Sequence, residues 1–205
     1  MVSPAETGSD PLAWTLNEAA TALARRTITS EELTKLCLAR VGKLDHQLNS
    51  FITLDADSAW NQARECDRRR KAGRVLSTLD GIPIALKDNI DTAGVRTTAA
   101  AQVFRDRIPA EDAEVTRRLK TAGLVCLGKL NLDEMAFAGT WTTGCFGPVH
   151  NPGIRIESRA VPRLAPPRRS ALDSALRQSA VMMVARSASQ ASIVVWWDSR
   201  PRTAA

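Results

Sequence analysis

The chain has 205 residues, of which 44% are hydrophobic and 24% are charged, a composition typical of a globular domain. It contains no apolar run near the roughly 20 residues of a membrane helix and no secretory signal pattern at its start, so we expect a cytoplasmic protein without membrane contact. Its net charge of +6 lies entirely in residues 151–205, which carry nine arginines, three acidic residues and no lysine.

The four cysteines lie far apart in the chain, form no C-x-x-C pair and are accompanied by only two histidines. This spacing argues against a zinc site and against a disulfide framework, so we predict neither a metal nor a cofactor. Cys37, Cys66 and Cys126 fall in segments with helix or strand patterns, where a free cysteine behaves as a small buried hydrophobic residue.

The first third of the chain has the residue spacing of amphipathic helices. We predict helices over residues 15–26, 29–44 and about 55–71. Thr29 and Glu32 form a T-x-x-E capping box at the start of the second helix. The third helix ends before Gly73.

The periodicity then changes to that of an α/β fold. Short apolar runs at residues 82–86 and 124–128 predict two buried strands, and the helical pattern of residues 114–122 lies between them. Residues 88–111 read as a long loop, which is usually functional or disordered. Strand, helix and strand in this order predict the α/β class with a partly parallel sheet. Asn131 and Glu134 repeat the capping pattern and predict a further short helix.

Lys87 directly follows the first predicted strand and has two interpretations. In the first, the strand ends and the lysine extends its ammonium group into water, which is the favoured interpretation for the residue taken alone. In the second, the amine is buried and its pKa is lowered, so that a neutral amine is available to take a proton and activate a serine.

The surrounding strings favour the second interpretation. "LDGIPIALKDNIDTAGVRTT", "EDAEVTRRLKTAGLVCLGKLNLDEMAFAGT" and "CFGPVHNP" resemble the amidase signature family, and the resemblance runs from about residue 14 to residue 152. The resemblance implies that Lys87 is the catalytic base of a Ser–Ser–Lys triad. It also implies a small carboxamide substrate, cleaved through an acyl-enzyme whose oxyanion is held by backbone N–H groups.

The family includes stand-alone amidases and the A subunit of glutamyl-tRNA(Gln) amidotransferase, which acts with further subunits on charged tRNA. "FAGTWTTGCFGPVHNP" looks more similar to the stand-alone enzymes. The resemblance also implies the fold, namely the N-terminal helices and the first βαβ unit of a longer, mixed-sheet domain. On this basis we expect the sheet to have an unpaired edge.

The resemblance stops after residue 152. The family continues with a Gly-Ser-rich segment that carries the bridging serine and then with a G-S-D-x-G-G-S-I-R-Q-P block that carries the nucleophile. Neither serine can be assigned in this chain, whose residues 153–205 are rich in Arg, Ser, Ala and Pro. The chain as written therefore keeps the lysine and lacks the serines that it would serve, and we predict that it is inactive.

A shift of one base explains this break. When the last base of each codon is read with the first two of the next, Met182–Met183 and Met183–Val184 must give Asp and Gly. In the same way Trp196–Trp197 and Trp197–Asp198 must give Val and Gly, and these forced pairs fall at the family's spacing. We infer a frameshift near residues 151–158. The expected organisation is a truncated amidase-signature domain over 1–152 and an out-of-frame tail over 153–205, irregular or disordered.

A protein of another class, in which the arginine-rich tail binds nucleic acid, is the remaining alternative. Such binding rests on phosphate contacts and weakens steeply with salt. The arginines of the tail follow no helical face and are not interleaved with stacking aromatic residues. The sequence therefore disfavours a nucleic-acid partner recognised through the tail.

Overall fold

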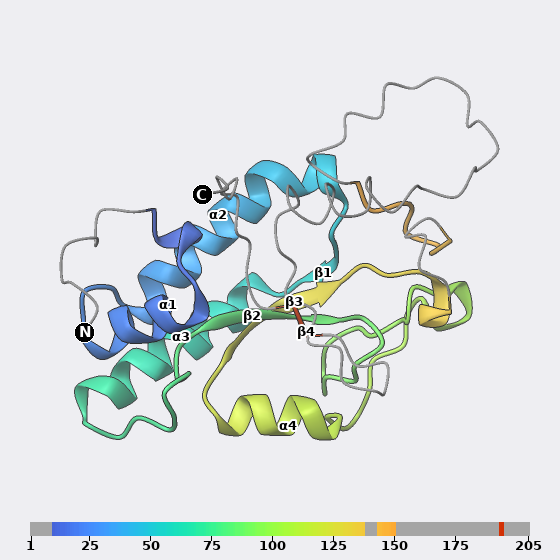
Figure 1. Cartoon of the computed structure of the whole chain (residues 1–205). Coiled ribbons are helices and arrows are strands. Elements are labelled where there is room, and N and C mark those ends of the chain that lie inside the picture. The colour runs from blue at the N-terminus through green and yellow to red at the C-terminus, as the bar shows by residue number, and fades with distance from the viewer. Residues whose placement is uncertain (1–9, 138–142, 151–192, 195–205) are drawn as a thin grey trace, which may run out of the picture.

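In a computed structural model, which describes residues 10–137, 143–150 and 193–194, a mixed sheet lies between helices on its two faces (Figure 1). The helices are α1 (Leu16–Ala24), α2 (Ser30–Leu48), α3 (Ala56–Lys71) and α4 (Glu114–Thr121). Helix α4 packs on one face of the sheet, whereas α2 and α3 pack on the other. The expected α/β class is confirmed.

Local signals in the sequence account for where the helices begin. Helix α2 starts with the expected capping box, in which Thr29 Oγ1 accepts from Glu32 N at 3.1 Å and Thr29 N donates to the Glu32 carboxylate at 2.9 Å. Helix α3 starts after Asp55, whose carboxylate accepts from Ser58 N at 3.2 Å. Helix α2 runs on to Leu48, beyond its expected end at residue 44, and stops at Asn49 in a left-handed conformation.

The sheet has the strand order β1-β3-β2-β4. The strands are β1 (Phe51–Leu54), β2 (Pro83–Lys87), β3 (Val125–Leu130) and β4 (Ile193–Val194). Strands β2 and β3 are parallel and joined through α4, which is the predicted βαβ unit. Strand β1 pairs antiparallel with β3 and was not predicted, because its four residues are mostly half-buried and lie in a short gap between two helices.

Strand β4 pairs antiparallel with β2 at Ala85 and Leu86. Strand β2 is therefore paired on both sides at these two positions, and β1 and β4 are the outer strands of the sheet. Apart from β4, the tail of residues 153–205 lies outside the described residues, and so the division of the chain at residue 152 stays a prediction.

A bulge in β3 changes which face its last residues occupy. Ile84 is in register with Cys126 but Leu86 is in register with Lys129, so β3 holds one extra residue between these pairs. Alternation alone would place Lys129 on the face of Val125, toward α2 and α3. The extra residue turns it to the face of Ile84 and Leu86, which pack toward α4.

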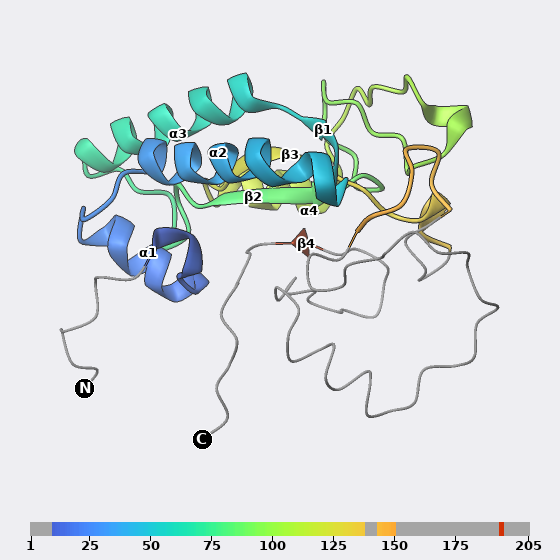
Figure 2. The ribbon, with the colours of Figure 1, turned by 90° about the horizontal axis from the view of Figure 1, so that it is seen from above.

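The carboxyl ends of β2 and β3 meet at one end of the sheet, where three other segments gather (Figure 2). These segments are the long loop after β2, the short 3-10 helix η3 (Glu134–Ala136) after β3, and residues 143–150. The predicted cap by Asn131 is wrong. Asp133 precedes η3 without a side-chain cap, and the Asn131 amide instead donates to Asn49 O at 3.0 Å and to Gly147 O at 3.1 Å.

Candidate active site

Lys87 is the last residue of β2 and lies in register with Leu130, the last residue of β3. Lys87 is only 6% exposed, which excludes the interpretation of a lysine head in open water. Burial lowers the pKa of Lys87 to about 8, although the nearby Asp133 carboxylate acts in the opposite direction. The structure therefore places an amine of lowered pKa at the carboxyl ends of two parallel strands, where α/β proteins commonly form their sites.

Asp133 is the acidic group whose charge raises the pKa of Lys87, against the effect of burial, and it was not predicted from the sequence. It is 2% exposed, and its Oδ1 atom accepts from the backbone N–H of Thr143 at 3.2 Å and from the Thr143 hydroxyl at 3.1 Å. These bonds tie residues 143–150 to the segment that follows β3. The carboxylate is thus held in place by a part of the chain that is remote from β2 in sequence.

Lys129 is a second buried lysine that was not predicted from the sequence. Its side chain is fully buried, and its Nζ atom donates to Ile90 O, to Thr97 Oγ1 at 2.8 Å and to Thr92 Oγ1 at 3.4 Å. Burial lowers the pKa of Lys129 to about 8, against the attraction of Asp88 and other acidic groups. A usable signal was present, because Lys129 follows an apolar run just as Lys87 does.

Other groups in the described residues do not suggest a different chemistry. Burial raises the pKa of Cys37 and of Cys66 to about 12, so both are core thiols in a form that is a poor nucleophile. Within residues 10–137 and 143–150, no group of three His, Cys, Asp or Glu side chains is placed to hold a metal ion.

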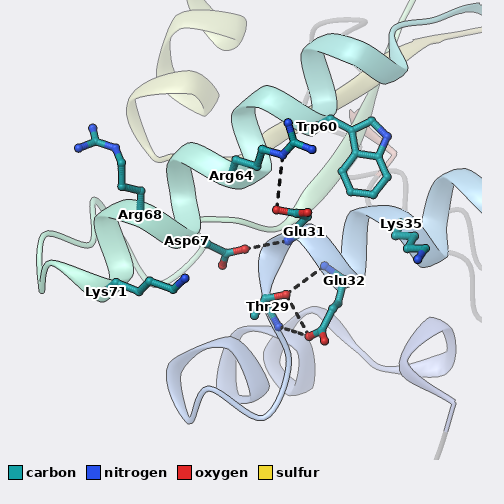
Figure 3. A pocket seen from close by; sticks show the side chains of 9 residues that line it. All are labelled: Thr29, Glu31, Glu32, Lys35, Trp60, Arg64, Asp67, Arg68 and Lys71. Atoms are coloured by element: carbon teal, nitrogen blue, oxygen red, sulfur yellow. Dashed lines mark hydrogen bonds and ion pairs between the residues drawn. The ribbon is translucent and has the colours of Figure 1, made fainter.

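A groove of about 570 Å³ lies between α2 and α3, and Lys87 is not among its lining residues (Figure 3). Its acidic side chains are engaged within the fold. The Asp67 carboxylate accepts from Ser30 N and Glu31 N at 2.9 Å each, and Arg64 lies 3.6 Å from the Glu31 carboxylate. The groove is lined by Thr29, Glu31, Glu32, Lys35, Trp60, Arg64, Asp67, Arg68 and Lys71. Because Asp67 stabilises the start of α2, we attribute a structural role to this groove rather than a catalytic one.

Comparison with known proteins shows which family and which individual proteins this chain resembles. A family described as Amidase matches residues 32–156. Over 138 residues the chain is 47% identical to the A subunit of glutamyl-tRNA(Gln) amidotransferase from Azotobacter vinelandii and 44% identical to the mitochondrial A subunit from Rattus norvegicus. Each alignment covers 67% of this chain, and 28% and 26% of the respective relative.

A solved structure, the peptide amidase of Stenotrophomonas maltophilia, matches with a TM-score of 0.62 and 33% identity over 72% of this chain and 30% of that one. The chain thus spans under a third of the length of the relatives that it matches. None of the helices in the described ranges is long and apolar enough to cross a membrane.

Proposed function

Because the chain belongs to the Amidase family, we propose that it carries the catalytic lysine of an enzyme that hydrolyses carboxamide C–N bonds. The observation that carries this proposal is the burial of Lys87 beside Asp133, which leaves its pKa at about 8. At pH 7.5 roughly a quarter of such amines are neutral, against roughly one in a thousand for an ordinary lysine. The neutral amine is the form that accepts a proton.

In the proposed mechanism Lys87 is the base of a Ser–Ser–Lys triad. Neutral Lys87 takes a proton from a bridging serine, which takes one from the nucleophilic serine as that oxygen attacks the carboxamide carbon. The tetrahedral oxyanion is held by backbone N–H groups, and the proton then returns to the leaving nitrogen as the C–N bond breaks. Water hydrolyses the resulting ester by the same proton relay. Neither serine is assigned in this chain, so we propose that the chain as written is inactive.

We further propose that residues 153–205 are read one base out of frame and do not form part of the family domain. The end of the family match at residue 156 supports this, because it falls within the interval of residues 151–158 inferred from the codons. The same shift explains why lysine is absent and arginine abundant beyond residue 151. Sequencing the DNA across codons 150–160 checks this proposal directly.

The activity is tested by comparing the 205-residue protein with a protein in which one base restores the frame. We expect hydrolysis of simple carboxamides by the frame-restored protein alone. In that protein Lys87→Ala should lower kcat/KM by about 10² to 10⁴, the usual contribution of a general base. Lys120→Ala is the matched control, because Lys120 is a partly exposed lysine paired with Asp112 on another part of the fold.

Two results would overturn the proposal. If Lys87→Ala left the activity of the frame-restored protein intact, Lys87 would not be the base. If the 205-residue chain hydrolysed carboxamides and lost that activity with Lys87→Ala, the proposed inactivity would be wrong.

A second candidate function is that of an amidotransferase A subunit, favoured by the identities of 44–47% to proteins of that name. In that case the partners would be the other amidotransferase subunits and a charged tRNA, and the amide would be that of glutamine. Glutamine hydrolysis that appears only after co-purification with such subunits would support it. Turnover of simple carboxamides by the frame-restored protein alone would favour the stand-alone enzyme.

The cytoplasmic location stays a prediction, since the relatives include a mitochondrial protein.

A further inference from the structure

Two buried charges at the candidate site have no part in the proposed proton relay. Lys129 is fully buried on β3, and Asp88 is fully buried directly after Lys87. Burial raises the pKa of the Asp88 carboxyl, and Lys129 counteracts this by attraction. Burying charge costs several kcal/mol per ion unless it is compensated. The position of these two groups next to Lys87 therefore calls for an explanation.

The backbone of β2 and β3 places both Lys129 and Asp88 near Lys87. Lys129 is adjacent to Leu130, the register partner of Lys87, and the bulge in β3 turns it away from α2 and α3. Gly128 permits this geometry. Its φ is +147°, and an added Cβ would lie 2.2 Å from the carbonyl oxygen of Thr53 on β1. The close approach of β1 to β3 thus requires glycine immediately before Lys129.

Two consecutive threonines in the long loop hold the two charges. Thr97 Oγ1 accepts from Lys129 Nζ at 2.8 Å. Thr98 donates to the Asp88 carboxylate from its backbone N–H at 2.8 Å and from its hydroxyl at 2.5 Å. The other carboxylate oxygen, Asp88 Oδ1, is buried without a hydrogen-bond partner in the described part of the chain. The cation and the anion therefore fix the same short stretch of backbone.

The two alanines that follow these threonines connect the long loop to the segments that contain Asp133 and Thr143. Ala99 and Ala100 have φ values of 51° and 53°, a conformation that costs alanine energy and requires support from its surroundings. Ala99 O accepts from Met135 N at 2.8 Å, and Ala100 O accepts from Cys145 N at 3.0 Å. Met135 lies two positions after Asp133, and Cys145 lies two positions after Thr143, the residue that binds Asp133.

We propose that Lys129 and Asp88 are positioning residues for Lys87, acting through Thr97, Thr98 and the left-handed Ala99–Ala100 turn. This inference rests on the proposed function, because it assigns the two groups to the same site. The turn holds the segments that carry Asp133 and Thr143 against the end of β2. It thereby keeps water from the Lys87 amine and fixes the carboxylate that faces it.

The test uses the complete 205-residue chain and needs no catalysis. Lysine labelled with ¹³C and ¹⁵N reports the titration of Lys87 by NMR, and Lys87→Arg identifies its signal. Lys129→Met removes the cation, Asp88→Asn removes the anion, and Thr98→Val removes one hydroxyl donor at nearly constant volume. Thr98→Ser keeps that hydroxyl, and Lys120→Met removes a lysine from α4; both serve as controls.

We expect the titration midpoint of Lys87 to rise from about 8 by roughly one pH unit in the first three variants, because water reaches the amine once the turn detaches. We expect it to stay in place in both controls. Circular dichroism identifies the variants that remain folded, and Thr98→Val provides the test if the removal of a buried charge prevents folding. Folded variants in which Lys87 still titrates near 8 would overturn the inference alone. A wild-type Lys87 that titrates near 10.5 would overturn the proposed function and this inference with it.

Discussion

The two ends of β2 handle buried charge in different ways. Before the strand, Asp80 is fully buried, and its carboxylate accepts from Arg69 Nη2 at 2.7 Å and from Leu76 N at 3.0 Å. At the other end, Lys87 keeps an amine of lowered pKa, and the neighbouring Asp88 has a carboxylate oxygen without a donor in the described residues. We call the Asp80 end saturated because each oxygen of its carboxylate accepts a hydrogen bond. We call the Lys87 end unsaturated because Asp88 Oδ1 accepts none within the described residues.

We interpret this difference as one between a structural charge at Asp80 and the proposed catalytic charge at Lys87. Burial alone would raise the pKa of Asp80, but the hydrogen bonds from Arg69 and Leu76 hold it below its ordinary value, so the carboxylate stays ionised and binds its neighbours together. Charges left partly uncompensated cost stability and acquire shifted pKa values, which is what acid–base chemistry requires. Substitutions at either end of β2 test this contrast, and we expect the largest effect at the saturated end.

Removal of the Asp80 carboxylate from the saturated end should lower the free energy of unfolding most. Asp80→Ala leaves the Arg69 guanidinium, 18% exposed, without its main partner, and we expect it to lower the free energy of unfolding by about 3–5 kcal/mol. Urea denaturation at pH 7 measures this. Because the pKa of Asp80 is lowered in the folded state, its contribution is present above the ordinary aspartate pKa near 4 and is lost as the pH falls through the folded value.

Glu114→Ala is the matched control for that loss. Its carboxylate pairs with Arg118 at 2.7 Å, but both side chains are more than half exposed, and such pairs contribute about 0–1 kcal/mol. Equal losses from the two variants would show that Asp80 is not a saturated structural charge, and the contrast between the two ends would then disappear.

Gly128, at the bulge of β3, provides a test at the unsaturated end. Gly128→Ala places a Cβ against the Thr53 carbonyl oxygen in a conformation that alanine rarely adopts, and we expect a loss of about 2 kcal/mol or more. Gly42→Ala is the control, because Gly42 lies within α2 with no atom within 4 Å of an added Cβ. It should be neutral or stabilise by up to about 1 kcal/mol. Denaturant midpoints compare the two, and a neutral Gly128→Ala would show that the close approach of β1 to β3 does not require glycine before Lys129.

Local signals made the helices and the central βαβ unit predictable. Thr29 and Glu32 sit at fixed spacing before an apolar pattern, and the runs that contain Ile84 and Leu127 are short and bounded. The arrangement around Lys87 was not predictable in the same way. The Asp133 carboxylate is held by Thr143, from a segment that folds back onto the end of β3, and the face on which Lys129 lies depends on one extra residue in that strand. Both depend on tertiary contacts that no sequence period records.

The pH dependence of stability tests the end of β2 that holds Lys87 directly. Folded Lys87 has a pKa of about 8, whereas an unfolded lysine titrates near 10.4, so between these values the unfolded chain binds more protons and the free energy of unfolding rises with pH. Lys87→Met removes this contribution. The difference between the two pKa values corresponds to about 3 kcal/mol across the window, and the folded value already includes the attraction of Asp133.

Lys129 has a similar pKa and keeps part of the slope in the variant. Cys37 and Cys66, whose pKa values are raised, lower the stability above about pH 9 in both proteins, so the informative quantity is the difference between variant and wild type. Lys120→Met, at a lysine 43% exposed, controls for the loss of one positive charge. If the Lys87→Met curve were parallel to that of the wild type, Lys87 would titrate as an ordinary lysine, and the carboxyl end of β2 would be as well compensated as the end that holds Asp80.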